Sequence, residues 1–164
     1  MKIVIAMDSF KGSLTSLEAG EAAAKGVTDS LPDSEIILMP LADGGEGTVS
    51  AIVNALGGEM VPAVVRGPLG TLIESSYGMV CAADDTGTSR VTALIEAADA
   101  AGLTKVPSSL RNPRKTTTAG LGDLIRHAVT RGIKDFVIGI GGSATNDCGL
   151  GMMESLGARF FDEA

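Results

Sequence analysis

Hydrophobic and polar positions in the first part of the chain alternate between strand-like and helix-like patterns. Short apolar runs at residues 2–7 and 35–39 predict buried strands. Apolar residues recur with helical spacing over 15–31 and 49–56, and the first of these segments opens with a capping-box pattern. A strand–helix–strand–helix order is typical of βαβ units, whose strands form a parallel sheet. Ligands bind at the carboxyl ends of strands in such sheets, so the loops after the two strands are candidate site segments.

The pattern changes near residue 60, where strand-like segments follow one another without intervening helices. These segments lie at residues 60–65, 71–77, 79–83 and 90–95, with turn-rich sequence at 66–70 and 84–88. Successive strands of this kind favour antiparallel hairpins. We therefore expect a domain boundary between residues 62 and 63, with an N-terminal segment at 1–62 and part of a second α/β domain at 63–164.

The last third of the chain returns to helices and strands in alternation. An apolar stripe predicts a helix over residues 118–131, and the run at 135–140 predicts a buried strand. Residues 150–156 show helical spacing, and residues 158–161 have the pattern of one more strand. Because the chain stops at Ala164 directly after that segment, we expect it to be a truncated part of a longer α/β protein.

Composition restricts the class of partner. The 164-residue chain carries a net charge of −7 and only 3% aromatic residues. An acidic chain with few aromatic side chains lacks the basic surface of a nucleic-acid-binding protein, and it does not suit anionic membranes. Its two cysteines, Cys81 and Cys148, lack metal-site spacing and are expected to be reduced thiols. No segment reaches membrane-spanning length, so we expect a cytoplasmic protein.

The first polar loop follows the strand expected at 2–7. Asp8, Ser9 and Lys11 place a carboxylate, a hydroxyl and an ammonium at the carboxyl end of that strand. Lys11 could neutralise a transferring phosphoryl group or a substrate carboxylate. An ordinary turn with an exposed lysine explains the same residues, and the residue order of a Walker A loop is absent.

The second polar loop, residues 43–48, carries Asp43 and Glu46 among three glycines. Two carboxylates in a tight backbone turn suit Mg²⁺ or substrate hydroxyls. A helix-capping turn, in which both acids only favour the helix dipole, explains them equally well. Arg66 lies in a later turn, where it could bind a carboxylate or phosphate through two parallel hydrogen bonds or remain a solvated charge.

The third polar loop follows the strand expected at 135–140 and leads into a helix. Its glycines permit close backbone approach to a ligand, and the helix adds free N–H groups and a positive dipole end. Hydroxyl and amide groups can bind phosphate oxygens, while a carboxylate can accept a proton or hold hydrated Mg²⁺. The candidate phosphate-binding residues are Gly141, Gly142, Ser143, Thr145 and Asn146, and the carboxylate is Asp147.

The same loop permits a different interpretation. Residues 139–144 fit Gly-x-Gly-x-x-Ala after a strand, and Asp162 follows a second expected strand at the distance of a ribose-binding acid. An NAD(P)-dependent oxidoreductase is therefore an alternative function. Two features count against it, since the first glycine lies inside the apolar run and Asn146 and Asp147 delay the helix.

Taken together, these motifs resemble the bacterial type I glycerate kinase family. The matching segments are, in order, 8–13, 41–48, 67–70, 111–113, 116–118 and 139–147. The resemblance implies transfer of the ATP γ-phosphoryl group to D-glycerate, giving 2-phosphoglycerate, in the cleft between two α/β domains. One domain would be Rossmann-like and built from both ends of the chain, and the other, with antiparallel strands, would be inserted within it. The chain departs from the usual residues of the family at Met7, Ala119 and Cys148.

The resemblance also suggests roles for the candidate residues. Catalysis would fall to Lys11, Asp43 and Asp147, and the two aspartates, which could exchange roles, are also the candidate Mg²⁺ ligands. The candidate substrate-binding residues are Asp8, Ser9, Glu46 and Arg66, while the third loop would hold the phosphates of ATP. Because family members are usually more than twice as long, a catalytically inactive fragment or assembly module is a second alternative, and homo-oligomerisation is left open.

Overall fold

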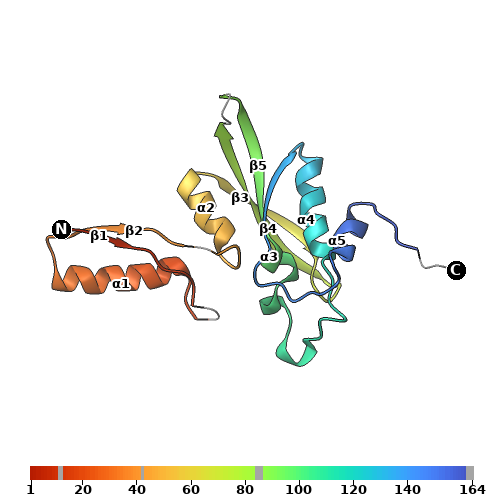
Figure 1. Ribbon diagram of the computed structural model, residues 1–164, viewed down its shortest axis with the longest axis horizontal. Helices are drawn as coiled ribbons and strands as arrows, with labels where there is room; N and C mark the ends of the chain where they lie inside the picture. The colour runs from red at the N-terminus through yellow and green to blue at the C-terminus, as the bar shows by residue number, and fades with distance from the viewer. Residues whose placement is uncertain (11–12, 42, 84–86, 162–164) are drawn as a thin grey trace.

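The computed structural model describes residues 1–10, 13–41, 43–83 and 87–161 (Figure 1). Its N-terminal part is a βαβ unit. Strands β1 (Lys2–Ile5) and β2 (Glu35–Leu38) pair in parallel, and helix α1 (Ser16–Ser30) connects them. The predicted capping box begins α1, since the Thr15 hydroxyl accepts the Glu18 N–H and the Glu18 carboxylate accepts the Thr15 N–H. The predicted parallel unit is therefore confirmed.

A four-stranded mixed sheet forms the other part of the molecule, in the order β3-β4-β5-β6. Strands β3 (Glu59–Arg66), β4 (Leu72–Ala83) and β5 (Ser89–Glu96) are antiparallel, and β6 (Asp135–Gly139) pairs in parallel with β5. The predicted α/β class is thus confirmed, with hairpins in the second part of the chain. In Figure 1 the β4–β5 hairpin extends well beyond the rest of the sheet.

The break expected between strands at 71–77 and 79–83 is wrong, because β4 runs without interruption through Gly78. Gly78 pairs with Met60 on one side and with Leu94 on the other. A Cβ atom there would lie 2.4 Å from a methyl group of Val53 and 2.8 Å from one of Val49. The glycine therefore permits close packing of a helix on the strand, and it does not mark a turn.

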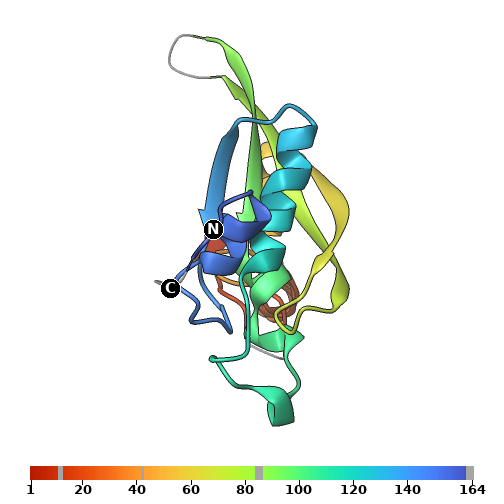
Figure 2. The same cartoon turned by 90° about the vertical axis from the view of Figure 1, so that its right-hand side faces the viewer.

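Helices cover both faces of the mixed sheet. Helix α2 (Thr48–Leu56) packs on one face, where Val49 and Val53 meet Val80 and Leu94 in a small core. The opposite face carries α3 (Ala97–Ala101), α4 (Ala119–Thr130) and α5 (Leu150–Ser155). Figure 2 shows α4 lying along the sheet with α5 beside it. The larger core there is formed by alternate residues of β3 and β5 with Tyr77 and the apolar stripe of α4.

Two short 3₁₀ helices, η1 (Leu103–Lys105) and η2 (Ser108–Leu110), lie between α3 and α4. Helix α2 precedes the predicted boundary at residues 62 and 63 but packs on strands that follow it. The boundary itself stays a prediction. No helix among the described residues is long and apolar enough to span a membrane.

The strand expected at 158–161 is wrong. These residues form no strand, and Phe161 is 85% exposed. Helix α5 ends at Ser155, and Gly157, just beyond its cap, has a left-handed backbone with φ +103°. The described chain then continues without a neighbouring strand to bond its backbone groups. An apolar pattern alone does not make a strand, because a strand needs a partner for its N–H and C=O groups.

Candidate active site

The second polar loop is a tight turn in which two backbone N–H groups donate to side chains of the same loop. The Gly44 N–H donates to the Thr48 hydroxyl at 3.0 Å, and the Gly45 N–H donates to Asp43 Oδ1 at 3.0 Å. Positive φ angles at Gly44 (+89°) and Gly47 (+91°) permit this path, which favours glycine at both positions. Asp43 and Glu46 are both exposed on this loop.

The second and third polar loops lie in direct backbone contact. The Gly141 N–H donates to the Gly44 carbonyl at 2.9 Å. A Cβ atom on Gly139 would lie 2.6 Å from that carbonyl oxygen, and one on Gly141 would lie 2.8 Å from Gly45 Cα. Since real Cβ atoms do not approach this closely, glycine at 139 and 141 is what allows the two loops to meet.

The third loop is held to the body of the protein by its backbone. The Gly142 carbonyl accepts the Leu103 N–H at 2.9 Å, and the Ala144 N–H donates to the Ala101 carbonyl at 2.8 Å. The Thr116 hydroxyl donates to the Ala144 carbonyl at 2.8 Å. These bonds fix the part of the loop between the strand and the helix without using its outward-facing groups.

The outward-facing groups of the third loop are donors. Gly142, Ser143 and Asn146 are exposed, and in the described part of the chain their N–H groups donate to no protein acceptor. The hydroxyls of Ser143 and Thr145 lie 2.8 Å apart, and the Thr145 N–H donates to Ser143 Oγ. Free amides beside paired hydroxyls form a surface suited to an anion such as a phosphate.

Asp147 faces inward and serves as an acceptor for surrounding groups. Its carboxylate accepts the Thr118 N–H and hydroxyl, both at 2.8 Å, and the N–H groups of Gly149 and Gly151, both at 3.2 Å. Burial disfavours ionisation, but the bonds from Thr118, Gly151 and Gly149 outweigh it, so the pKa of Asp147 lies below its ordinary value. This geometry joins the third loop to the first turns of α4 and α5.

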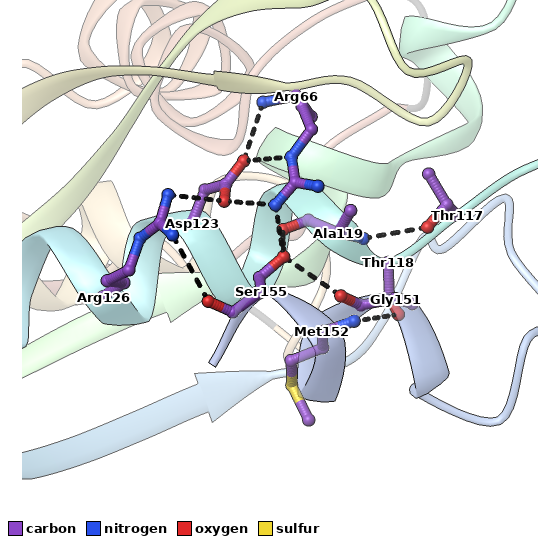
Figure 3. Close-up of polar contacts among 9 residues, drawn as sticks. All are labelled: Arg66, Thr117, Thr118, Ala119, Asp123, Arg126, Gly151, Met152 and Ser155. Atoms are coloured by element: carbon purple, nitrogen blue, oxygen red, sulfur yellow. Dashed lines mark hydrogen bonds and ion pairs between the residues drawn. The ribbon is translucent and has the colours of Figure 1, made fainter. Parts of the chain in front are cut away.

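Arg66, at the end of β3, is engaged by an ion pair. Its Nε and Nη2 atoms donate to the Asp123 carboxylate at 2.8 and 2.6 Å, and Nη2 also donates to Ser155 Oγ (Figure 3). The Arg66 guanidinium, through these hydrogen bonds, holds the pKa of Asp123 below its usual range despite burial. The arrangement connects β3, α4 and α5.

Helices α4 and α5 pack tightly beside this ion pair. The single Ser155 O–H is shared between the carbonyls of Ala119 and Gly151, and the Met152 N–H donates to the Thr118 hydroxyl (Figure 3). The Thr118 hydroxyl therefore bonds both Asp147 of the third loop and Met152 of α5, the helix that also carries Ser155 beside the ion pair.

The first polar loop lies beside a pocket between the βαβ unit and α2. The Ser9 N–H donates to Asp8 Oδ1 at 2.7 Å, whereas Lys11 lies outside the described residues. The pocket has a volume of about 980 Å³, and its lining includes Ser9 and Glu46 together with Ser50 and Asn54. Two of the candidate substrate-binding residues thus share one cavity, although they come from different loops.

Glu96, the last residue of β5, was not predicted from the sequence as a site residue. Its side chain is buried, and its carboxylate accepts the N–H groups of Gly47 at 3.2 Å and Val49 at 2.5 Å, at the start of α2. Burial raises its pKa, and the two N–H donors offset this only in part. The available signal was an acid at the end of an apolar strand, where parallel sheets place functional groups.

A profile of the glycerate kinase family matches residues 3–164. The chain belongs to the glycerate kinase family. It is 48% identical to the glycerate kinase of Bacillus subtilis (strain 168) over 164 residues, which are all of this chain and 41% of that protein. It is 46% identical to the glycerate 2-kinase of Escherichia coli (strain K12) over 162 residues, 99% of this chain and 41% of that protein.

A crystal structure from Salmonella typhimurium LT2, described as a candidate glycerate kinase 2, has the same glycerate kinase fold as this chain. The TM-score is 0.72 and the identity 49%, over 97% of this chain and 41% of that one. The chain therefore spans about two-fifths of the length of the glycerate kinases that it matches.

The oxidoreductase alternative is not favoured. The expected second strand before Asp162 is absent, and Asp162 itself lies outside the described residues. Gly139, the first glycine of the pattern, belongs to β6, where it packs against the carbonyl of Gly44. The close neighbour of this glycine is thus the second polar loop of the same chain.

Proposed function

We propose that the protein carrying this chain is an ATP-dependent glycerate kinase that phosphorylates D-glycerate to 2-phosphoglycerate. One observation carries the proposal: the Gly141-to-Gly44 hydrogen bond joins a loop with exposed carboxylates to a loop with free backbone donors. Phosphoryl transfer requires both kinds of group side by side, because catalysis consists of positioning and charge neutralisation.

The donors of the third loop would hold phosphate oxygens. The amides of Gly142, Ser143 and Asn146 are exposed, and the hydroxyls of Ser143 and Thr145 lie beside them. Gly141 contributes by its backbone contact with the second loop. N–H and O–H groups fixed in advance can stabilise charge on the transferring group without reorganising during the reaction.

Glycerate would bind in the pocket between the βαβ unit and α2. Ser9 and Glu46 line this pocket, and hydroxyl and carboxylate groups suit the two hydroxyls of the substrate. The carboxylate of glycerate needs a cation, and Lys11 of the neighbouring first loop is the proposed one, with Asp8 orienting the loop through the Ser9 N–H. Arg66 stays a prediction as a second cation, since Asp123 and Ser155 occupy its Nε and Nη2 atoms.

Asp43 and Asp147 would have different duties. In the described part of the chain one oxygen of Asp43 accepts only the Gly45 N–H, so this exposed carboxylate can act as a base or a metal ligand. The oxygens of Asp147 already accept bonds from Thr118, Gly149 and Gly151, which suits a positioning role better than proton transfer. A catalytic or metal-binding role for Asp147 stays a prediction.

Magnesium fits this arrangement as a companion of the nucleotide. Among the described residues no group of three or more acidic, histidine or cysteine side chains could cage a metal ion. Mg²⁺ in kinases is held by one or two carboxylates together with phosphate oxygens and waters, and Asp43 with Glu46 would supply the protein share. When bound, the ion would neutralise phosphate charge.

The direct test uses the full-length protein with ATP, Mg²⁺ and D-glycerate, with ³¹P NMR to distinguish the phosphorylated carbon. We expect 2-phosphoglycerate from the wild type and a loss of kcat of about 100-fold or more for Asp43→Asn. Asp29→Asn removes the same charge from an exposed position on α1 and should leave kcat unchanged. No turnover by the wild type would refute the proposed function. Equal turnover by the two variants would refute the role of Asp43.

A further inference from the structure

Glu96 occupies a special place between the two joined loops. It is the last residue of β5 and pairs in register with Gly139, the last residue of β6. Its side chain crosses to α2 and accepts the N–H groups of Gly47 and Val49, while the Gly44 carbonyl lies over Gly139. At the paired ends of β5 and β6, Glu96 thus reaches the second loop with its side chain, whereas Gly139 leaves room for the backbone of that loop.

The second loop is held at both ends, by Gly141 at its start and by Glu96 at its end. At its start, the Gly44 carbonyl accepts the Gly141 N–H, and at its end the amides of Gly47 and Val49 donate to Glu96. Helix α2 has no side-chain cap of its own, since its N-cap residue is a glycine. The carboxylate that completes this helix start therefore comes from a residue 47 positions later in the chain than Val49.

We propose that Glu96 is a positioning residue for phosphoryl transfer, because its carboxylate fixes the loop carrying Asp43 and Glu46 against the loop that would bind phosphate. This inference rests on the proposed kinase function. Glu96 touches neither substrate in this scheme. It acts through the backbone of residues 47–49 and thereby sets the distance between the acidic side chains and the transferring group.

The burial of Glu96 supports this role. A buried carboxylate is costly unless hydrogen bonds compensate it, and here the compensating donors belong to the loop itself. The neighbouring carboxylates of Asp99 and Glu46 add repulsion and raise the pKa of Glu96 further. An apolar residue at this position would avoid both the desolvation and the repulsion. The hydrogen bonds to Gly47 and Val49 therefore account for an acid here.

The test compares Glu96→Ala and Glu96→Gln in the full-length enzyme, with kcat, both KM values and melting temperature measured for each. The alanine variant should lose about 10- to 100-fold in kcat with KM values changed less than about threefold, since a displaced loop misaligns the reaction more than it weakens binding. The glutamine variant keeps the length and one acceptor, so it should recover a large part of that loss.

Asp99→Ala is the matched control for Glu96→Ala. Asp99 lies three residues further along, on α3, and accepts the Ser76 N–H at 2.7 Å, so its loss removes a comparable bond to a backbone amide away from both loops. We expect its kcat within about twofold of wild type even where its melting temperature falls as far as that of Glu96→Ala. Amide hydrogen exchange should speed up at Gly47 and Val49 in Glu96→Ala only.

The outcomes separate the two claims. A wild-type enzyme that does not phosphorylate glycerate would overturn the proposed function, and the role of Glu96 in it. An active wild type with unchanged kcat in Glu96→Ala, a glutamine variant no better than alanine, or unchanged exchange at Gly47 and Val49 would overturn the inference about Glu96 alone.

Discussion

Replacing Gly139 by alanine tests whether close contact between the two loops is required for activity. Gly139 has an ordinary strand conformation, so the backbone accepts an alanine without torsional strain. The added methyl group would, however, lie 2.6 Å from the Gly44 carbonyl oxygen, and that partner is backbone that cannot rotate away. The second loop must move, or β6 must shift.

The size of the effect follows from this distance. The carbonyl would have to retreat by roughly 0.8 Å to reach ordinary van der Waals separation, which lengthens the Gly141-to-Gly44 hydrogen bond. Overpacking of this kind costs about 1–3 kcal/mol, and the weakened hydrogen bond adds about 1 kcal/mol. Reduced freedom of the unfolded chain returns about 0.4–1 kcal/mol, so the net loss is roughly 1–3.6 kcal/mol.

The assay is steady-state kinetics of the full-length enzyme together with thermal melting. A displacement approaching 1 Å at the site should lower kcat by about 10- to 100-fold. Gly26→Ala is the matched control, because Gly26 lies in α1 with nothing within 4 Å of its added Cβ. That change should stabilise the helix by up to about 1 kcal/mol and leave kcat unchanged.

One result would refute the reasoning. If Gly139→Ala melted like Gly26→Ala and kept wild-type kcat, the contact between Gly139 and Gly44 would not limit the separation of the loops. A loss of stability with unchanged kcat per folded enzyme would show that the loops need not meet this closely for catalysis.

Three further predictions concern the supports of the site. Asp147→Asn should lower both melting temperature and kcat/KM, the latter by about tenfold, because an amide cannot accept all the donors around it; steady-state kinetics with circular dichroism melting checks this. Thr15→Ala should cost about 1 kcal/mol by removing the α1 cap, without a change in kcat, as measured by melting and turnover. The free energy of unfolding should fall as pH drops below the unfolded aspartate pKa of about 3.9 and on through the lowered folded pKa values of Asp123 and Asp147. Melting temperatures measured from pH 7 to 3 should depend less on pH in Asp123→Asn, because Arg66 has already lost its partner in that variant at neutral pH.

The elements of the βαβ unit could be predicted because their signals are local. The capping box at Thr15 and Glu18 and the apolar strand runs need no knowledge of distant residues. The continuity of β4 through Gly78 was missed for the opposite reason, since the place of this glycine is defined by valines on α2 that approach the strand in space. The strand expected at 158–161 failed in the same way, because pairing depends on a neighbour that the pattern does not encode.

In the candidate site, too, residues with a local sequence signal could be predicted and residues defined by distant contacts could not. Position at the carboxyl ends of strands was enough to select the second and third loops, whose contact through Gly44 and Gly141 agrees with a shared site. It was not enough to find Glu96, which has no loop glycine or motif beside it and gains its role only when α2 folds onto the sheet.

The four acidic residues near the two loops differ in their hydrogen-bond partners, a difference that the sequence does not reveal. Asp147 and Glu96 both face inward and accept several backbone N–H groups, so their lone pairs hold structure in place. Asp43 and Glu46 are exposed, and among the described contacts only the Gly45 N–H donates to either carboxylate, so their other oxygens remain available to a substrate or a metal ion. A carboxylate that positions a loop cannot also take up a proton without releasing that loop, because protonation removes acceptors from the amides around it. We therefore expect the exposed Asp43 and Glu46 to take part in the transfer, Glu96 to position the loop that carries them, and Asp147 to hold the third loop against α4 and α5.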